Sequence, residues 1–298
     1  RALAHAPRPL VVHTHSSKAG VLGRLAARAV RADAVVHSVH GFAFHALQGA
    51  TRRGAFMLVE RLSAPLADAY ICVSRADLEL GLRQGLFGDS RAELIRSGIV
   101  FEQFSYREQD RRRIRTTLGI PLDAPVVGTV ANFKPQKAPL DFVAVAARVL
   151  DARPEARFIY VGDGALRPQV EAAARNAGIE ERLQLVGWQR DVAAFLSAFD
   201  VFLLTSHHEG LPRSVLQALT SGCAVVATRT GGPDEVVAPE LLAAPGDIDG
   251  LSARVLTALD VPRPPRAASP LSDRLRAFSA ERMVRDQERL YRELIERR

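Results

Sequence analysis

The segment from Val201 to Ala227 limits the possible folds of this chain more than any other. It opens with the apolar run VFLLT, which is typical of a strand buried on both faces of a parallel sheet. Gly210-Leu211-Pro212 then turns the chain, and we expect a helix over Ser214–Leu219, because proline is favoured in a first helical turn. Gly222 ends that helix, and the next strand begins at Ala224. Strand, helix and strand in this order predict an α/β fold.

The turn at Gly210 also indicates an anion site. A helix start presents unpaired N–H groups and a partial positive charge, which suit a diphosphate. A second turn, Gly231-Gly232-Pro233, precedes Asp234-Glu235, where we expect another helix to open. Glu209 lies directly before the first turn. A carboxylate repels a phosphate at contact distance, so we expect Glu209 to accept hydrogen bonds from hydroxyl groups. An anion site beside a hydroxyl acceptor describes a nucleotide sugar.

Strands and helices alternate along the rest of the chain at spacings that predict parallel sheets. Strands are expected at Leu10–His13, Ala34–Ser38, Ala69–Val73, Glu93–Ile95, Pro125–Val130, Phe158–Val161 and Leu183–Val186. Ser16-Ser17 is expected to cap a helix that runs to about Val30, and a second helix is expected at Arg52–Ala67. The pattern predicts an amino-terminal domain over residues 1–106, a second domain over residues 107–277 and a terminal helix within residues 278–298.

Basic residues gather at the amino-terminal end of the chain. The net charge is +7, and residues 1–64 hold nine Lys or Arg against Asp33 and Glu60, whereas the remainder is balanced. This excess predicts either an anionic surface or anionic acceptor nearby, or simply solvated arginines. Nucleic acid is disfavoured as a partner, because no aromatic residues interleave with the basic ones.

Two further compositional features narrow the class of protein. Cys72 and Cys223 both lie in apolar, strand-like contexts, as expected for buried free thiols in a reducing cytosol. No run of about 18 uncharged apolar residues occurs, so no transmembrane span is expected.

The segment around Glu209 resembles the donor-binding core of the retaining glycosyltransferases of family 4, which have the GT-B architecture. Their pattern is Glu, seven residues, Glu, with Gly-Leu or Gly-Phe after the first acid; this chain has Glu209-Gly210-Leu211 and then Gln217 in place of the second acid. The resemblance implies an α/β fold of two Rossmann-like domains facing a cleft, with the donor in the second domain and the acceptor in the first. It also implies that the terminal helix crosses back to the first domain. It covers nearly the whole chain and is strongest over Val126–Val237.

The first domain is expected to be incomplete at its start. Domains of this kind normally open with a strand, a Gly-rich loop and a helix, and none of these precedes Leu10. On the order of 60–80 residues, or about two strand–helix–strand pieces, are expected to be absent.

The resemblance assigns roles to the loops around the expected diphosphate. Lys137 matches a lysine that neutralises the charge developing on the departing diphosphate. Asn132 replaces the family's arginine, so Lys134 is a second candidate cation. Glu209 is expected to hold the sugar hydroxyls, and Gly210 and Leu211 lead into the helix start that binds the diphosphate.

The remaining assignments concern the nucleotide and the sugar. Gln217 is expected to accept a hydrogen bond from the ribose, and Glu235 is either a binding residue or a structural one. Gly162 is expected to let the backbone approach the nucleotide. Gly187 starts the turn that meets the base, where Trp188 is either exposed to the ligand or part of the core. His40 matches the first-domain histidine that faces the donor sugar.

Two motifs suggest metals, and both are interpreted otherwise. His13 and His15 share one side of a strand, but no third ligand is spaced to help them, so His15 is instead a candidate for the acceptor side. Asp247-Ile248-Asp249 lies between a short strand and a helix, where aspartate forms turns and caps. No metal site is expected. The resemblance implies no cofactor beyond the donor substrate, which is expected to be UDP- or GDP-linked.

The sequence therefore predicts a metal-independent glycosyltransferase that moves a sugar to an acceptor hydroxyl with retention of configuration. We expect same-face attack, because no pair of acids suggests a double displacement. The HTHSSKAG and HGFAFH segments resemble bacterial members that build polysaccharides or lipid-linked glycans, which implies a cytoplasmic protein, peripheral on the inner face of the membrane. Two alternatives stay open: a nucleotide-sugar binding protein without turnover, and a nucleotide-sugar epimerase. A non-enzymatic membrane-surface module is more distant.

Overall fold

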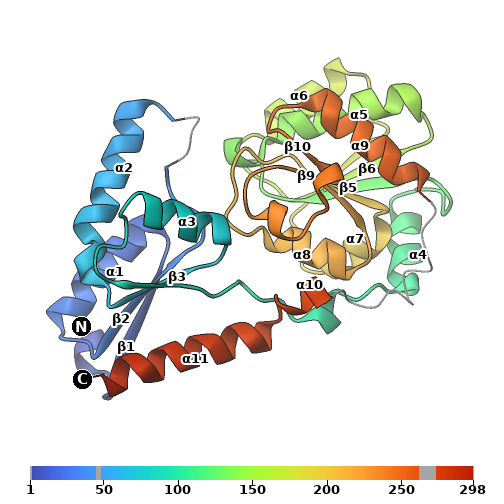
Figure 1. Cartoon of the computed structure of the whole chain (residues 1–298). Coiled ribbons are helices and arrows are strands. Elements are labelled where there is room, and N and C mark those ends of the chain that lie inside the picture. The colour runs from blue at the N-terminus through green and yellow to red at the C-terminus, as the bar shows by residue number, and fades with distance from the viewer. Residues whose placement is uncertain (1, 45–47, 262–272, 298) are drawn as a thin grey trace. The chain divides into compact units, whose positions relative to one another are not determined.

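A computed structural model describes residues 2–44, 48–261 and 273–297. The chain forms two compact units, one of residues 1–98 and 277–298 and the other of residues 99–276 (Figure 1). Each unit has its own parallel β-sheet with helices on both faces, as predicted for two Rossmann-like bodies. The division falls at Gly98–Ile99 instead of the expected 106–107, because the short turn Phe101–Phe104 packs against two helices of the second unit.

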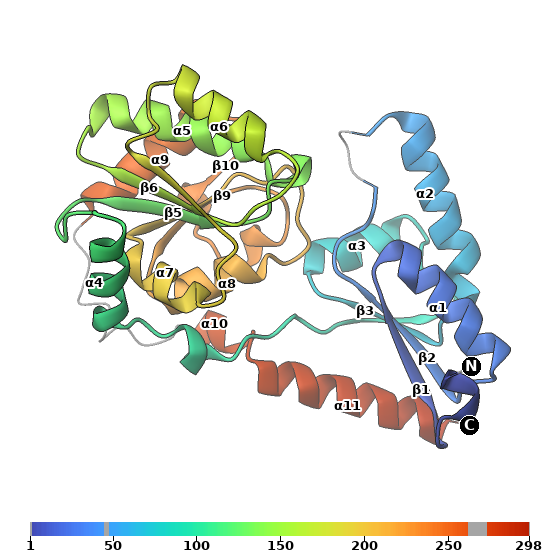
Figure 2. The ribbon, with the colours of Figure 1, turned by 180° about the vertical axis from the view of Figure 1, so that it is seen from behind.

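The first unit is built on a four-stranded sheet of order β1-β2-β3-β4. Its strands are β1 (Val11–His15), β2 (Ala34–Val39), β3 (Ala69–Cys72) and β4 (Arg91–Leu94), and its helices are α1 (Ser17–Ala29), α2 (Ala50–Ser63), α3 (Arg75–Arg83) and α11 (Ala280–Glu296), with 3-10 turns η1 (Ala2–His5) and η2 (Ala64–Leu66). Helices α1, α2 and α3 lie on one face of the sheet and α11 on the other (Figure 2). Leu290 and Leu294 of α11 pack against strand residues such as Ala34 and Ile71.

The second unit has six parallel strands in the order β10-β9-β8-β5-β6-β7. Its strands are β5 (Val126–Val130), β6 (Arg157–Val161), β7 (Leu183–Gly187), β8 (Val201–Leu204), β9 (Ala224–Thr228) and β10 (Leu242–Ala243). Its α-helices are α4 (Glu108–Thr117), α5 (Pro139–Ala152), α6 (Arg167–Asn176), α7 (Val192–Ala198), α8 (Arg213–Thr220), α9 (Ile248–Asp260) and α10 (Asp273–Arg276), and its 3-10 turns are η3 (Phe101–Phe104), η4 (Pro135–Lys137), η5 (Pro233–Glu235) and η6 (Pro239–Leu241). Helices α5, α6 and α9 cover one face, and α4, α7 and α8 cover the other (Figures 1 and 2).

The strand order of the second unit reverses between β5 and β8. The chain first proceeds outward from β5 to β6 and β7, and then returns to place β8 on the opposite side of β5. The loops that leave the two central strands therefore diverge to opposite faces of the sheet and leave a crevice at its carboxyl edge. Ligands of open α/β sheets bind at such a switch point.

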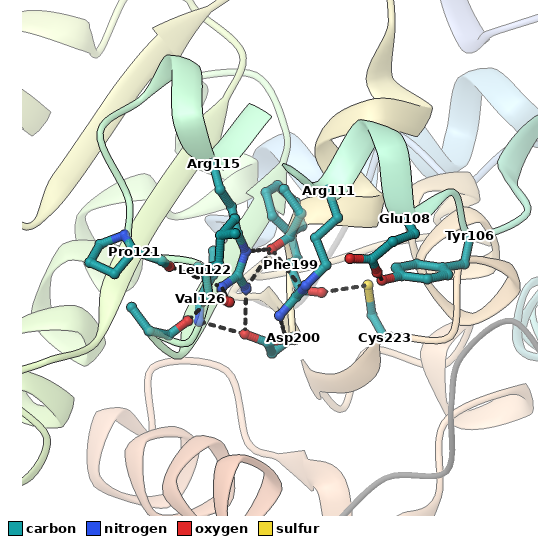
Figure 3. A network of polar contacts seen from close by, with 12 residues as sticks. Tyr106, Glu108, Arg111, Arg115, Pro121, Leu122, Val126, Phe199, Asp200 and Cys223 are labelled. Carbon is teal, nitrogen blue, oxygen red and sulfur yellow. Dashed lines mark hydrogen bonds and ion pairs between the residues drawn. The ribbon is translucent and has the colours of Figure 1, made fainter. Parts of the chain in front are cut away.

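The opposite edge of this sheet is fixed by a buried arginine. The Arg115 side chain is fully buried, and its guanidinium donates to Asp200 Oδ2 at 2.7 Å and to the Ala198 carbonyl at 2.9 Å (Figure 3). It also donates to three carbonyls in the loop between α4 and β5, those of Pro121, Leu122 and Ala124. Asp200 Oδ2 accepts from the Val126 N–H as well, so one ion pair joins α4 to the starts of both central strands.

Several local predictions need correction. Ser16 precedes α1 with φ at 64°, outside the usual N-cap conformation, and its side chain makes no capping hydrogen bond. The helix expected from Arg52 to Ala67 ends at Ser63, just before Pro65. The helix expected at Asp234-Glu235 is only the 3-10 turn η5, and shortly after it Ala238 is extended before Pro239, a residue that disfavours a helical conformation in its predecessor.

Candidate functional site

Hydrogen bonds hold together the two loops that leave the central strands β5 and β8. Thr205, directly after β8, donates its hydroxyl to the carbonyls of Lys137 and Ala138 at 3.0 and 3.1 Å. The His207 N–H donates to the Gln136 carbonyl at 2.8 Å, and the Gln136 amide donates back to the His208 carbonyl at 2.9 Å. Backbone groups on both sides are thus paired, which fixes the side chains that these loops carry.

Lys137 and Glu209 face each other across this junction. The Lys137 ammonium donates to Glu209 Oε1 at 2.6 Å, and their side chains are 21% and 7% exposed. The two residues are 72 positions apart in sequence, yet the predicted pairing of an ammonium and a carboxylate at one site is present. An ammonium has three N–H donors, so Lys137 can hold Glu209 and still donate to a phosphate.

A cavity of about 290 Å³ lies at the same edge of the sheet, beside Lys137. Its lining comes from the loops after β5, β6, β7 and β8, and includes Asn132, Gly162, Trp188, Gln189, Arg213 and Ser214. All of these loops leave the carboxyl ends of parallel strands, where the sheet reverses its order. The cavity is therefore placed where this fold binds ligands.

The start of α8 contributes to this cavity as the Gly210 turn predicted. Pro212, Arg213 and Ser214 all line it. Pro212 occupies the N-cap position and has no side-chain acceptor, so no side-chain cap bonds the first-turn N–H groups of the helix. Helix starts of this kind attract anions.

Arg213 was not predicted as a site residue. It is the first residue of α8, it is exposed, and it lines the cavity that Lys137 also lines. Within the second unit as described, no carboxylate forms a salt bridge with it. The family's arginine is replaced by Asn132 in this chain, and Lys134 was the expected substitute; Arg213 lines the cavity, whereas Lys134 does not. The signal was present in the sequence, since Arg213 directly follows the Gly-Leu-Pro turn.

At two positions another loop's backbone comes so close that only glycine, which has no Cβ, fits. Gly162 has φ at 141°, and a Cβ there would lie 1.9 Å from the Ala131 carbonyl oxygen. A Cβ at Gly232 would lie 1.5 Å from the Gly210 carbonyl oxygen. Gly162 lines the cavity. Glycine is needed there mainly because the loop after β6 contacts the Ala131 carbonyl in the loop after β5. Gly232 likewise presses the second turn against the first, where Glu209 and Gly231 form a parallel bridge.

The other predicted residues lie farther from the cavity lining. Lys134 is exposed and is not among the lining residues, and Gly187 precedes the two lining residues Trp188 and Gln189 without lining the cavity itself. Trp188 is 71% exposed, so its interpretation as a core residue was wrong. Gln217 lies one turn along α8 and is half-buried, and Glu235 lies in η5, where its carbonyl accepts from Arg274. Leu211 is buried beneath the turn.

In the first unit, histidines from β1 and the end of β2 form a row. His15 Nδ1 lies 2.9 Å from His40 Nε2, and the His13 ring stands 4.3 Å from the His15 ring, centroid to centroid. His13 also contacts Tyr291 of α11 at 2.5 Å and Ser38 at 2.8 Å. The predicted His40 is thus held by a neighbouring imidazole. Among the described residues, no group of three His, Cys, Asp or Glu side chains has an arrangement that could hold a metal ion.

Two buried histidines, His13 of this row and His37 of β2, which contacts Thr14 and Tyr70 instead, should make the chain sensitive to acid. Burial lowers the pKa of His13 to about 4, helped by the charges of His15 and His40. Burial lowers the pKa of His37 to about 3, helped first by the Arg24 charge and then by His13, His15 and His40. Because these values lie below the unfolded value of 6.5, the unfolded state binds more protons between about pH 6.5 and pH 4. Stability is therefore complete above pH 6.5 and falls as the pH drops.

We expect urea unfolding to report this loss. Each buried histidine should remove up to about 1.4 kcal/mol of unfolding free energy per pH unit between pH 6 and pH 4. His37→Gln should reduce the slope of unfolding free energy against pH, whereas His5→Gln, a change at an exposed position, should leave that slope unchanged. Equal slopes for the wild type and His37→Gln would contradict the assignment.

Comparison with known proteins agrees with the fold. The family model described as "Glycosyl transferase 4-like domain" matches residues 1–98, and the model described as "Glycosyl transferases group 1" matches residues 124–260. One match lies in each of the two units. Together with the two Rossmann-like bodies, they define a glycosyltransferase of the GT-B class. The chain belongs to the family 4 glycosyltransferases.

Curated relatives act in glycan synthesis. The chain is 31% identical over 233 residues to the UDP-Gal:alpha-D-GlcNAc-diphosphoundecaprenol alpha-1,3-galactosyltransferase of Escherichia coli, which covers 77% of this chain and 60% of that protein. It is 35% identical over 158 residues to the 2-deoxystreptamine glucosyltransferase of Streptomyces kanamyceticus, covering 51% of this chain and 41% of the relative. The chain thus spans about 60% or less of the length of these relatives.

Solved structures share the fold. Sucrose-phosphate synthase from Thermosynechococcus elongatus superposes with a TM-score of 0.78 at 22% identity, over 97% of this chain and 74% of that one. The Anabaena protein HepE, solved with UDP and glucose, gives a TM-score of 0.76 at 21% identity, over 94% of this chain and 77% of that one. At these identities the likeness shows the fold alone.

Proposed function

We propose that this protein transfers a hexose from a nucleoside-diphosphate sugar to an acceptor hydroxyl with retention of configuration. The contact of Lys137 with Glu209 at 2.6 Å, beside the start of α8, carries the proposal. A cation and a helix start suit a diphosphate, and a carboxylate suits the hydroxyls of a sugar. The cation, the helix start and the carboxylate all lie at one edge of the second unit's sheet.

Uridine diphosphate is the proposed leaving group, with a GDP-linked donor as the alternative. The name of the E. coli relative specifies a UDP-linked galactose donor, and the solved structure of HepE contains UDP. Trp188, which is exposed, and Gln189 both line the cavity. They supply an apolar face and hydrogen-bonding groups for a base. We place the nucleotide there and the diphosphate between Lys137 and α8.

The proposed reaction proceeds on one face of the sugar. The acceptor oxygen forms a bond to the anomeric carbon as the bond from that carbon to the diphosphate oxygen breaks, and the leaving diphosphate takes the acceptor proton. Lys137, Arg213 and the α8 amides stabilise the charge that the departing diphosphate gains. Arg213 thereby supplies the second cation that Asn132 lacks. This scheme needs no metal ion, and the role of His40 at the donor sugar stays a prediction.

The proposed acceptor is a lipid-linked glycan or a growing cell-surface polysaccharide. The E. coli relative is named for a diphosphoundecaprenol-linked acceptor. Among the described residues, no helix is both long enough and apolar enough to cross a bilayer. We therefore propose a protein of the cytoplasmic side that meets its acceptor at the membrane surface.

The test is nucleotide release from a panel of UDP- and GDP-sugars, with and without a diphosphate-linked glycolipid acceptor, in buffer containing EDTA. We expect acceptor-dependent release of UDP and a product with the donor's anomeric configuration, both unaffected by EDTA. Donor binding without release would identify a binding protein. An epimerised sugar nucleotide formed without acceptor would identify an epimerase.

A further inference from the structure

A hydrogen bond joins two histidines at one edge of the first unit's sheet. His15 is the last residue of β1, and His40 directly follows β2, the neighbouring parallel strand. Nδ1 of His15 lies 2.9 Å from Nε2 of His40. Both residues stand at the carboxyl edge of the sheet, the edge at which open α/β sheets bind their ligands. The contact between the two rings therefore controls what each can offer to a ligand there.

The two rings share one proton. Neutral imidazoles hydrogen-bond only when one nitrogen carries a proton and the other a lone pair. Partial burial lowers the pKa of His15 below its ordinary value, so its ring is neutral at pH 8. If the His40 Nε2–H donates, both rings carry their proton on Nε2, the nitrogen that neutral histidine prefers. If the His15 Nδ1–H donates, both rings must carry it on Nδ1, so the first arrangement is the more stable one.

A third histidine supports this pair. The His13 ring lies 4.3 Å from the His15 ring, centroid to centroid, and is tilted from it by 34°. The Tyr291 hydroxyl lies 2.5 Å from His13 Nδ1, and the Ser38 hydroxyl lies 2.8 Å from His13 Nε2. A phenol is a stronger donor than an alcohol, so Tyr291 donates to Nδ1 and the Nε2–H of His13 donates to Ser38. Both nitrogens of His13 are thus bonded, and this fixed ring restricts the rotation of His15.

We infer that His15 is a positioning residue for His40. It accepts the His40 Nε2–H, so His40 can offer a substrate only the lone pair of Nδ1 and no N–H group. Such a lone pair accepts from a hydroxyl of the donor sugar or of the acceptor, and it repels the oxygens of a diphosphate. The inference rests on the proposed function, because it requires a hydroxyl-bearing substrate at His40.

Nuclear magnetic resonance of protein labelled with nitrogen-15 histidine shows which ring nitrogen carries the proton. At pH 8 we expect His40, identified by the loss of its signals in His40→Asn, to be protonated on Nε2 and bare on Nδ1. His15→Leu should give His40 a mixture of both tautomers. His5→Leu, a change at the histidine of η1, should leave the His40 tautomer unchanged. A proton on His40 Nδ1 in the wild type, or an unchanged His40 tautomer in His15→Leu, would overturn the inference.

Sugar transfer gives a second measurement. His15→Leu should lower kcat/KM about five- to tenfold, because His40 loses the hydrogen bond that fixes its tautomer. His15→Asn should recover most of this loss, because the amide oxygen lies near the place of Nδ1 and accepts the same N–H. Unchanged kcat/KM in His15→Leu, or equal losses in the two variants, would contradict the positioning role.

Binding measurements on His15→Leu distinguish the two sources of the hydroxyl. Weaker binding of UDP-sugar with unchanged binding of UDP assigns it to the donor sugar, whereas a higher KM for the acceptor alone assigns it to the acceptor. Thermal unfolding checks that each variant keeps the fold. The resonance spectra involve no substrate, so they decide the tautomer of His40 even if no nucleotide sugar supports transfer, a result that would contradict the proposed function.

Discussion

Replacing Lys137 by methionine is expected to lower kcat for sugar transfer by about a hundredfold to a thousandfold. The ammonium donates to Glu209 and lines the cavity beside α8, so it is placed to stabilise the charge that the leaving diphosphate gains. Methionine keeps most of the side-chain length and removes the charge. The loss should appear mainly in kcat, because the diphosphate carries more charge in the transition state than in the bound donor.

Lys134→Met provides the matched control. Lys134 belongs to the same loop but is exposed and does not line the cavity, so its loss should change kcat less than about threefold. The loss of kcat caused by Arg213→Met should lie between the losses caused by Lys134→Met and Lys137→Met. Equal effects of the Lys134 and Lys137 changes would mean that the loop contributes only general positive charge.

Replacing Arg115 by methionine is expected to destabilise the second unit by about 3–5 kcal/mol. Its guanidinium is fully buried, and it satisfies the Asp200 carboxylate and the carbonyls of Ala198, Leu122 and Ala124 (Figure 3). Methionine fills the space but removes these hydrogen bonds, and only Asp200 and the Ala198 carbonyl keep a contact with a neighbouring arginine, Arg111. Urea unfolding, followed by circular dichroism, measures the change.

Arg112→Met on the same helix is the control for this experiment. Arg112 pairs with Glu108 on the surface, where both side chains are more than half exposed, so its loss should cost no more than about 1 kcal/mol. A cost below about 1 kcal/mol for Arg115→Met would show that the buried network does not hold α4 to the sheet.

The sequence predicted the sheets and the proximity of Lys137 to Glu209, for identifiable reasons. VFLLT and VVGTV are short apolar runs between turn residues, and both became central strands, β8 and β5. Lys137 and Glu209 each follow one of these strands. The carboxyl ends of parallel strands share one edge, so their proximity could be inferred without knowing the strand order.

Features that depend on tertiary contacts could not be predicted in this way. Asp234-Glu235 has the composition of a helix start, but only a 3-10 turn forms there. Arg24 and Arg115 are fully buried, although arginine is normally a surface residue, because their partners come from distant segments. The position of Arg213 in the cavity lining likewise requires coordinates.

In the proposed mechanism, one group holds the diphosphate and a different group holds the sugar. Calorimetric titration tests this division of roles. Wild type and Glu209→Gln are each titrated with UDP and with the UDP-sugar from which the enzyme releases UDP. We predict that Glu209→Gln binds the UDP-sugar about tenfold or more weakly, because a charge-assisted hydrogen bond to a hydroxyl is lost. It should bind UDP as tightly as wild type or more tightly, because Lys137 is no longer drawn to a carboxylate. Equal weakening of both ligands, or of neither, would contradict the account.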